Sequence, residues 1–156
     1  MIEQAVLDAD SEKIGEAVNP LSGAERLAGG ETILFVEDEP FVREVTAEVL
    51  RGAGYRVLTA TNAATAARTY DLLGRDVDLL LADIGLPGEN GCALAEKLRQ
   101  SDPELKVLFT SGHTEYVAWR KVGREICLAK PFSVEALLEK VRQVLDRAAT
   151  ADRKNS

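Results

Sequence analysis

The segment Val77–Gly88, with the sequence VDLLLADIGLPG, constrains the fold of this chain more than any other stretch. An unbroken apolar run leads directly to the carboxylate of Asp83, and a loop with Gly85 and Pro87 follows. A short apolar run bounded by turn residues is typical of a strand buried on both faces, as in a parallel sheet. Asp83 is then expected at the carboxyl edge of the sheet, where open α/β folds bind ligands. An aspartate after a strand is also common in ordinary turns, so the rest of the chain must decide its role.

Patterns typical of strands and of helices alternate after residue 30. The sequence predicts strands at Thr32–Val36, Tyr55–Ala60, Val77–Asp83, Lys106–Thr110 and Ile126–Lys130, and helices at Phe41–Arg51, Ala63–Leu73, Gly91–Gln100, Thr114–Lys121 and from Ser133 to about Leu145. In the first helix, Val45, Val49 and Leu50 are expected to form the buried stripe. Strands that alternate with helices predict an α/β fold, with a parallel five-stranded sheet covered on both faces through right-handed crossovers.

The length of 156 residues is sufficient for one domain with its own hydrophobic core. Residues 1–30 are polar and contain the breakers Asn19-Pro20 and Gly29-Gly30, so we expect a leader or linker there. We assign the domain to residues 31–147 and a polar tail to residues 148–156. Few residues follow Leu145, so we expect no output domain in this chain, which is then either a stand-alone domain or one end of a longer protein.

Composition and charge narrow the class of protein. The net charge of −7 disfavours a nucleic-acid-binding surface, which needs a basic face. No apolar stretch approaches the roughly 20 residues that span a bilayer, and the acidic N-terminus lacks the layout of a signal peptide. We therefore expect a cytoplasmic protein that neither inserts into membranes nor binds nucleic acid directly. Cys92 and Cys127 are far apart in the sequence, and we expect them to be buried fillers rather than a disulfide or a zinc site.

Polar side chains stand at the ends of four predicted strands. The first strand leads to Glu37 and Asp38, the third to Asp83, the fourth to Thr110 and the fifth to Lys130. Each has an ordinary explanation when taken alone, such as acids at the start of a helix or a lysine in a turn. The carboxyl ends of parallel strands meet at one edge, however, so all five side chains are expected in one shallow cleft.

Such a cluster needs a cation, because three carboxylates close together repel one another. Mg²⁺ prefers oxygen ligands, whereas zinc more often binds His or Cys, which this cluster lacks. With the cation and Lys130 present, the cleft can receive a phosphoryl group, and Thr110 can donate a hydrogen bond to one of its oxygens. A carboxylate nucleophile beside the metal, such as Asp83, can then form an aspartyl phosphate.

These motifs resemble the receiver domain of bacterial two-component response regulators. The matching pieces, in the family's order and spacing, are VEDEP with Glu37 and Asp38, LLLADIGLPG with Asp83, FTSG with Thr110, and AKPF with Lys130. The resemblance covers about Glu31 to Arg147. It implies a flavodoxin-like (βα)5 three-layer sandwich with strand order 2-1-3-4-5 and one bound Mg²⁺. It also implies that the chain is either a stand-alone receiver or the C-terminal end of a hybrid sensor histidine kinase.

The resemblance also implies a role for each site residue. Asp38 and Asp83 would bind the metal directly, the backbone carbonyl of Gly85 would be a third ligand, and Glu37 would act mainly through water. Asp83 would take the phosphoryl group from a phosphohistidine on a sensor histidine kinase or a phosphotransfer domain. The domain would catalyse this transfer and the later hydrolysis without being a free-standing metabolic enzyme. The downstream partner is not identified, and homodimer formation is left open.

Several residues depart from the family pattern or extend it. Cys127 stands where many members carry an aromatic side chain that turns inward on phosphorylation, so the output face is expected to change by other means. The acid pair is Glu-Asp rather than Asp-Asp, and Gly85 and Gly112 are small at two positions that in the family tune hydrolysis. Val42 falls off the predicted buried stripe, and we hypothesise that it is exposed and contacts the kinase; an ordinary exposed valine is the alternative.

The segment before the fifth strand holds His113, Tyr116 and Trp119. His113 is expected to be a loop residue rather than a catalytic base, because the mechanism needs no extra base. Tyr116 and Trp119 lie on the predicted fourth helix, which belongs to the family's output face. They are either packing residues or partner contacts, and the sequence alone leaves both interpretations open.

Three other classes of protein were weighed. A receiver that only acts as a scaffold would lack part of the set of Asp38, Asp83, Thr110 and Lys130, which is complete here. A metal-dependent phosphatase of another α/β family would carry a D-x-D pattern, whereas Asp83 is followed by Ile84-Gly85. A dinucleotide-binding enzyme would carry a G-x-G-x-x-G sequence after its first strand, which this chain lacks.

Overall fold

The computed structural model describes residues 30–112 and 126–155. The described elements are, in chain order, β1 (Thr32–Val36), α3 (Pro40–Gly52), β2 (Arg56–Ala60), α4 (Ala63–Leu73), the short 3₁₀ helix η1 (Gly74–Asp76), β3 (Leu79–Asp83), α5 (Gly91–Ser101), β4 (Lys106–Ser111), β5 (Ile126–Ala129) and α7 (Val134–Asn155). Strands and helices alternate as the sequence predicts, and most boundaries agree within two residues.

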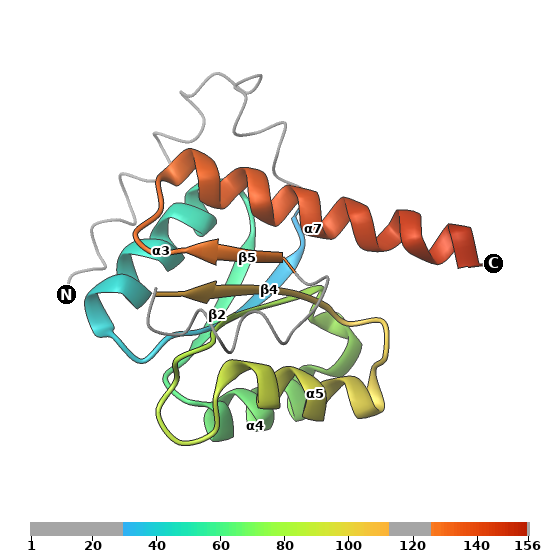
Figure 1. The fold of residues 1–156 in the computed structure, drawn as a ribbon, viewed down its shortest axis with the longest axis horizontal. Coiled ribbons are helices and arrows are strands. Elements are labelled where there is room, and N and C mark those ends of the chain that lie inside the picture. Colours follow the sequence, from blue (N-terminus) through green and yellow to red (C-terminus); the bar gives the residue numbers. More distant parts are fainter. Residues whose placement is uncertain (1–29, 113–125, 156) are drawn as a thin grey trace.

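The five strands form one parallel sheet in the order β2-β1-β3-β4-β5. Helices α3 and α7 cover one face of the sheet, and α4 and α5 cover the other (Figure 1). The predicted flavodoxin-like three-layer α/β fold and strand order are therefore confirmed. Because all strands run the same way, their carboxyl ends lie along one edge, where Glu37, Asp83 and Thr110 emerge.

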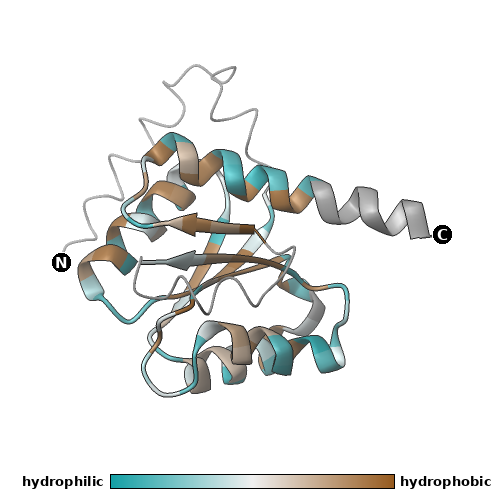
Figure 2. Cartoon of the chain, in the orientation of Figure 1, coloured by the Kyte–Doolittle hydropathy of each residue, from teal (hydrophilic) through white to brown (hydrophobic). Residues whose placement is uncertain are grey.

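The two faces of the sheet contribute side chains to two separate hydrophobic cores. In β1 and β3, Ile33, Phe35, Leu79 and Leu81 belong to the core under α3 and α7, while the residues between them belong to the core under α4 and α5. This alternation explains why the sequences of β1 and β3 are almost continuously apolar: each of their residues is buried, on one face or the other. Figure 2 shows the resulting hydrophobic strands between the two helical layers.

Proline and helix-capping residues mark where the helices begin. Pro40 occupies the first turn of α3, where its missing N–H costs nothing. Asn62, Asn90 and Ser133 each accept a hydrogen bond from the backbone N–H three residues later, at 2.8, 2.8 and 3.0 Å. These caps satisfy N–H groups that have no partner inside the helix, and so they set where α4, α5 and α7 begin.

One prediction about packing is wrong. The buried side chains of α3 are Thr46, Ala47 and Leu50, whereas Val45 is exposed and Val49 is only half-buried. The row of Val45 and Val49 has the spacing of a buried stripe, but the helix turns it toward a groove beside α7. Cys92 and Cys127 are likewise half-buried rather than buried, and both pack against the core under α4 and α5.

Some expectations fall on residues that are not described. The predicted helix Thr114–Lys121, with Tyr116 and Trp119, lies outside the described residues, and so does His113. Helix α7 continues to Asn155, so most of the predicted polar tail is helical. Among the described helices, none has the length and apolar character required to cross a bilayer.

Candidate functional site

Lys130 joins two acidic side chains that come from different strands. Its Nζ donates to Glu37 Oε1 at 2.9 Å and to Asp83 Oδ2 at 3.0 Å. The backbone N–H of Lys130 donates to the carbonyl of Ser111 at 2.9 Å, which fixes the residue at the end of β4. The structure therefore brings together the ends of β1, β3 and β5 through one ammonium group.

Glu37 is the most deeply buried acid of the site, with 1% of its surface exposed. Its Oε2 accepts a hydrogen bond from the backbone N–H of Glu39 at 3.0 Å, and its Oε1 faces Lys130. Burial raises the pKa of the Glu37 carboxyl, and the nearby Asp83 charge adds to this, although both hydrogen bonds oppose the shift. Burial alone would lower the pKa of Lys130, but its bonds to Glu37 and Asp83 outweigh burial and raise it. Lys130 therefore stays charged between the two carboxylates.

The acids also suit a divalent cation. Glu37, Asp38 and Asp83 each direct one carboxylate oxygen to a common region, and these oxygens lie within 4.8 Å of one another. Two ligands on opposite sides of Mg²⁺ lie about 4 Å apart, so small side-chain movements bring these oxygens into range. Asp38 is exposed and has room to turn, whereas Asp83 is 5% exposed. This all-oxygen donor set, made up of the carboxylates of Glu37, Asp38 and Asp83, fits the preference of Mg²⁺ for oxygen ligands.

Gly85 lies beside the carboxylate of Asp83. Its backbone N–H donates to Asp83 Oδ1 at 3.1 Å, and the residue itself is exposed. Asp83 thus has one oxygen held by Gly85 and the other by Lys130. The rigid hold on both oxygens fixes the direction in which the carboxylate faces the cleft.

Thr110 contributes a buried hydroxyl group. It pairs with Asp83 in the register of β3 and β4, and it is 1% exposed. The described residues offer Thr110 Oγ1 no hydrogen-bond partner. A buried hydroxyl without a partner is costly, and such groups often await a ligand. A phosphoryl oxygen bound at Asp83 would satisfy this donor.

Two further residues of the site were not singled out from the sequence. A Cβ atom on Gly91 would lie 2.5 Å from the backbone carbonyl oxygen of Asp83, so only glycine allows α5 to begin so close to β3. Arg43 Nη1 donates to the backbone carbonyl of Glu37 at 3.0 Å. The glycine after Asn90 was a visible signal, but its contact depends on how α5 meets the sheet. No sequence pattern marks the contact of Arg43.

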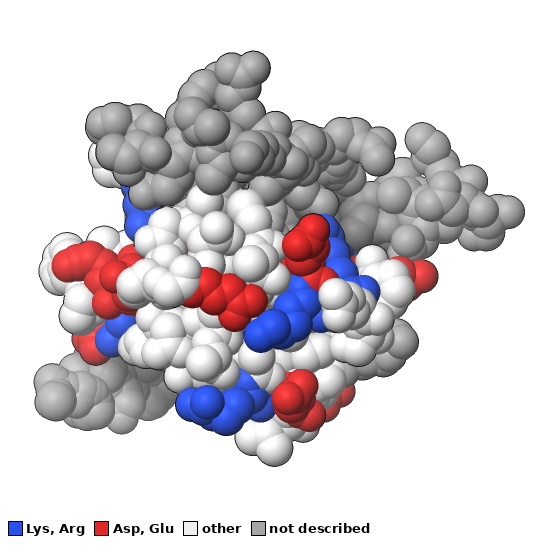
Figure 3. All heavy atoms as spheres, turned by 60° about the horizontal axis from the view of Figure 1, so that its bottom comes forward, with Lys and Arg blue, Asp and Glu red and all other residues white. Residues whose placement is uncertain are grey.

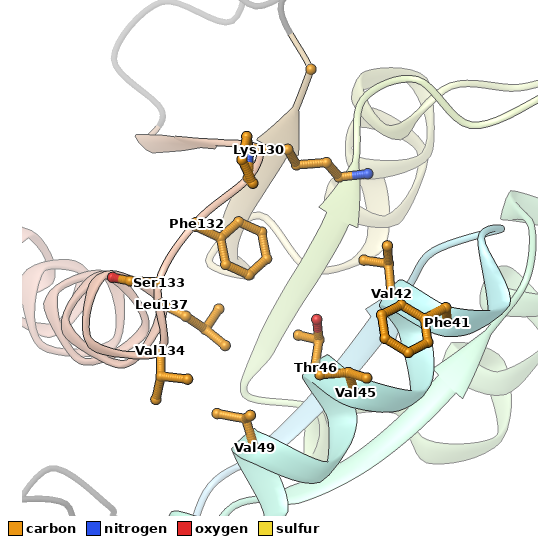
Figure 4. Close-up of a pocket in the computed structure, with 12 residues that line it drawn as sticks. Phe41, Val42, Val45, Thr46, Val49, Lys130, Phe132, Ser133, Val134 and Leu137 are labelled. Carbon is orange, nitrogen blue, oxygen red and sulfur yellow. The ribbon is translucent and has the colours of Figure 1, made fainter.

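An apolar groove of about 590 Å³ opens next to the site. Phe41, Val42 and Val45 of α3 face Phe132, Val134 and Leu137 across it (Figure 4). Lys130 and Pro131 form its inner end, so the groove and the acidic cluster share a residue. The sequence predicts an exposed Val42, but the side chain is half-buried because it lies on the groove wall. Phe41 is 74% exposed, and Val45 is exposed as well. We refer to this feature, bounded by α3 and the start of α7, as the α3–α7 groove.

Charged side chains of both signs are interspersed over the face shown in Figure 3. Acidic groups lie on its left side, the end toward which the arrows of β4 and β5 point in Figure 1, and also on its right side and near its lower edge. This face is therefore mixed in charge.

The comparisons with known proteins agree with this geometry. The family model described as the response regulator receiver domain matches residues 33–142. The chain belongs to this family. Receiver domains of two-component systems accept phosphoryl groups, and the acidic cluster beside Asp83 and Lys130 fits that role.

Individual relatives are similar at about one third identity. The sensor kinase CckA of Brucella abortus is 31% identical over 142 residues, which cover 89% of this chain and 15% of that protein. The phosphate regulon transcriptional regulatory protein PhoB of Pseudomonas aeruginosa is 33% identical over 128 residues, or 79% of this chain and 55% of that protein. The matched part of this chain thus covers about a seventh of the length of CckA and about half of the length of PhoB.

A solved structure of the receiver domain from the hybrid histidine kinase CckA superimposes with a TM-score of 0.64 at 35% identity. The match covers 73% of this chain and 98% of that domain. The agreement over nearly the whole of a solved receiver domain supports the receiver fold of this chain.

Proposed function

We propose that this receiver accepts a phosphoryl group on Asp83 from a phosphohistidine of a sensor histidine kinase or a histidine phosphotransfer domain. The observation that carries the proposal is the arrangement of Asp83, whose two carboxylate oxygens are held by Gly85 and Lys130. Glu37 and Asp38 offer carboxylate oxygens beside it, and its neighbour in the sheet is Thr110, whose hydroxyl finds no hydrogen-bond partner among the described residues. An acid at the end of a buried strand, next to a cation site and a lysine, is suited to phosphoryl chemistry.

The transfer requires each residue in a defined role. A carboxylate oxygen of Asp83 attacks phosphorus, the new P–O bond forms, and the P–N bond to the partner's imidazole breaks, so the electron pair leaves with the imidazole nitrogen. Lys130 pairs with a phosphoryl oxygen, and Thr110 donates its hydroxyl proton in a hydrogen bond to another. Bound Mg²⁺ would offset the negative charge on the acids and on the phosphoryl group. Asp38 and Asp83 would hold it, with the carbonyl of Gly85 as a further ligand and Glu37 acting through water.

The α3–α7 groove supports a docking surface for the phosphohistidine partner. It is apolar, it lies beside the acceptor site, and Val42 forms part of its wall. Apolar side chains such as Phe41 are exposed at its rim, and exposed apolar patches often mark protein-binding surfaces. The partner would place its histidine over Asp83 while apolar side chains of the partner fill the groove.

The similarity to the sensor kinase CckA supports a receiver that forms one end of a hybrid kinase. The similarity to PhoB supports a receiver that belongs to a response regulator. A stand-alone receiver remains the other arrangement. We propose the receiver at residues 31–147, with a leader before it and a tail after it, in the cytoplasm. The catalytic steps are confined to phosphorylation and dephosphorylation of Asp83.

The test is the intact mass of the protein after incubation with acetyl phosphate and Mg²⁺. The expected result is the addition of one phosphoryl group, which is lost on treatment with base. Chelation of the metal by EDTA and the substitution Asp83→Asn should each abolish the addition. An adduct that persists in Asp83→Asn would assign the acceptor to another residue. No adduct together with no Mg²⁺ binding would instead support a receiver that acts only as a scaffold.

A further inference from the structure

Arg43 lies in the first turn of α3, next to the acid pair of Glu37 and Asp38. Its Nη1 donates to the backbone carbonyl of Glu37 at 3.0 Å and, more weakly, to that of Asp38 at 3.5 Å. Its backbone N–H donates to the carbonyl of Glu39 at 2.9 Å. One residue of the helix therefore contacts three consecutive residues of the loop that follows β1.

The guanidinium of Arg43 contacts the backbone of the loop after β1. Within the described part of the chain, no carboxylate pairs with its guanidinium, and its hydrogen bonds go to the two backbone carbonyls. A guanidinium presents several N–H donors in a fixed plane, so it can hold neighbouring carbonyl groups in one orientation. Its positive charge also lies next to the short loop that carries two of the three acids of the cluster.

The two acids depend on this contact to different degrees. Glu37 is held at four points: its N–H donates to Ala60, its two carboxylate oxygens accept from Lys130 and Glu39, and its carbonyl accepts from Arg43. Asp38 is exposed, and its carbonyl contact with Arg43 lies at the outer limit of a hydrogen bond. Arg43 therefore holds the loop backbone from which the Asp38 side chain projects, and so sets the positions that this carboxylate can reach.

We infer that Arg43 is a positioning residue that fixes the loop of the acid pair and thereby sets the affinity of the site for Mg²⁺. This inference rests on the proposed metal-dependent acceptor function. Arg43 touches neither the phosphoryl group nor the metal; it acts through the backbone of Glu37 and Asp38. Residues that orient metal ligands commonly change metal affinity by about tenfold or more when they are replaced.

The experiment compares Arg43→Gln with Arg51→Gln. Arg51 is a matched control because it lies on the same helix and also donates to a backbone carbonyl, that of Val57, at 2.9 Å and away from the site. The Kd for Mg²⁺ is measured by isothermal titration calorimetry. We expect Arg43→Gln to raise this Kd about tenfold. Arg51→Gln should keep the Kd within about twofold of that of the original protein.

A kinetic readout separates positioning from a general loss of structure. The rate of phosphorylation by acetyl phosphate is measured against Mg²⁺ concentration for each variant. In Arg43→Gln the half-saturating concentration should rise by about the same tenfold, while the rate at saturating Mg²⁺ stays close to that of the original protein. Arg43→Lys, which keeps the charge and can donate to the carbonyls, should recover most of the affinity.

The outcomes are distinct. If the original protein binds Mg²⁺ and is phosphorylated, but Arg43→Gln matches Arg51→Gln in Kd, the inference about Arg43 is overturned and the proposed function stands. If the original protein neither binds Mg²⁺ nor is phosphorylated, the proposed function fails and the inference fails with it. Circular dichroism checks that each variant is folded. If Arg43→Gln does not fold, Arg43→Met, which keeps the aliphatic stem, is measured instead and judged by the same criteria.

Discussion

Lys130 Nζ and Asp83 Oδ2 form an ion pair of 3.0 Å. The pair spans β4, because Asp83 ends β3, Lys130 follows β5, and β4 lies between these two strands in the sheet. The lysine chain crosses the end of β4 and also pairs with Glu37 at 2.9 Å. Three strands are thus tied together at the edge of the sheet by one side chain. The same contact holds one oxygen of the Asp83 carboxylate, which we propose as the phosphoryl acceptor.

Replacement of Lys130 by Met should destabilise the protein. Glu37 and Asp83 would remain buried without their cation, which should lower the free energy of unfolding by about 1–3 kcal/mol. Urea denaturation without Mg²⁺ measures this loss, and added Mg²⁺ should reduce it because a second cation reaches the same acids. Lys97→Met, which breaks only the exposed pair with Glu89, is the control and should cost about 0.5 kcal/mol or less. Equal losses in the two variants would contradict the special role of Lys130.

Thr110→Val should separate stability from activity. The substitution removes a buried hydroxyl for which the described residues offer no partner, so we expect the free energy of unfolding to stay the same or to rise by up to about 1 kcal/mol. Phosphorylation by acetyl phosphate should slow, because the donor to the phosphoryl oxygen is lost. Thr110→Ser restores the hydroxyl and should restore much of the rate. A clear loss of stability in Thr110→Val would show that the hydroxyl is already satisfied in the folded protein.

Gly91→Ala should disturb the acceptor through the backbone. The new Cβ would meet the Asp83 carbonyl oxygen at 2.5 Å, so α5 or the end of β3 must move. We expect a destabilisation of about 1–3 kcal/mol by thermal denaturation, together with slower phosphorylation. Gly52→Ala is the control, because nothing lies within 4 Å of its Cβ position. A Gly91→Ala protein as stable as Gly52→Ala would mean that the contact relaxes freely.

Glu31→Gln should change how stability depends on pH. Arg142 Nη2 donates to Glu31 Oε2 at 2.8 Å. Burial alone would raise the pKa of Glu31, but the hydrogen bond and charge of Arg142 outweigh burial and lower it below its ordinary value of 4.5. A lowered pKa stabilises the folded state above the ordinary pKa, and this contribution is lost as the pH falls through the folded-state pKa.

We therefore expect Glu31→Gln to reduce the free energy of unfolding by about 0.5–1 kcal/mol near neutral pH. The difference from the original protein should shrink as the pH is lowered below 4.5, the ordinary value for the carboxyl. Urea denaturation over a pH series measures both effects. A difference that is the same at every pH would assign the loss to packing rather than to the ion pair.

Val42→Asp should impair transfer from a phosphohistidine protein but not from acetyl phosphate. A charge on the wall of the α3–α7 groove would oppose apolar docking, and we expect transfer to slow by about tenfold or more. Leu72→Asp is the control, since Leu72 is an apolar side chain exposed on α4, in the opposite helical layer. Equal transfer rates in Val42→Asp and Leu72→Asp would rule out docking at this wall. Slower reaction with acetyl phosphate as well would indicate damage to the site itself.

Much of the site could be predicted because it follows from topology. Once β1, β3 and β4 are read as parallel neighbours, Glu37, Asp83 and Thr110 must emerge at one edge, and Lys130 follows the edge strand. The apolar runs identified these strands because residues on both faces are buried.

The remaining features depend on how layers meet, which the chain's pattern does not specify. Val45 and Val49 have the spacing of a core stripe, yet α3 is rotated so that this row faces the groove beside α7. Gly91 is necessary only because α5 begins against the carbonyl of Asp83. The contacts of Arg43 likewise arise from the path of the loop after β1, and only the assembled structure reveals them.

The acceptor carboxylate stands at the end of a strand in which Leu79, Leu80, Leu81 and Ala82 have no exposed surface. Amide protons in such a central strand exchange with solvent only when most of the fold opens, so β3 should be among the slowest segments in hydrogen exchange. Asp83 is thus anchored to a strand that should open rarely. We therefore expect a response to phosphorylation to begin with the side chains next to Asp83, such as Thr110 and Lys130, rather than with a shift of β3 itself.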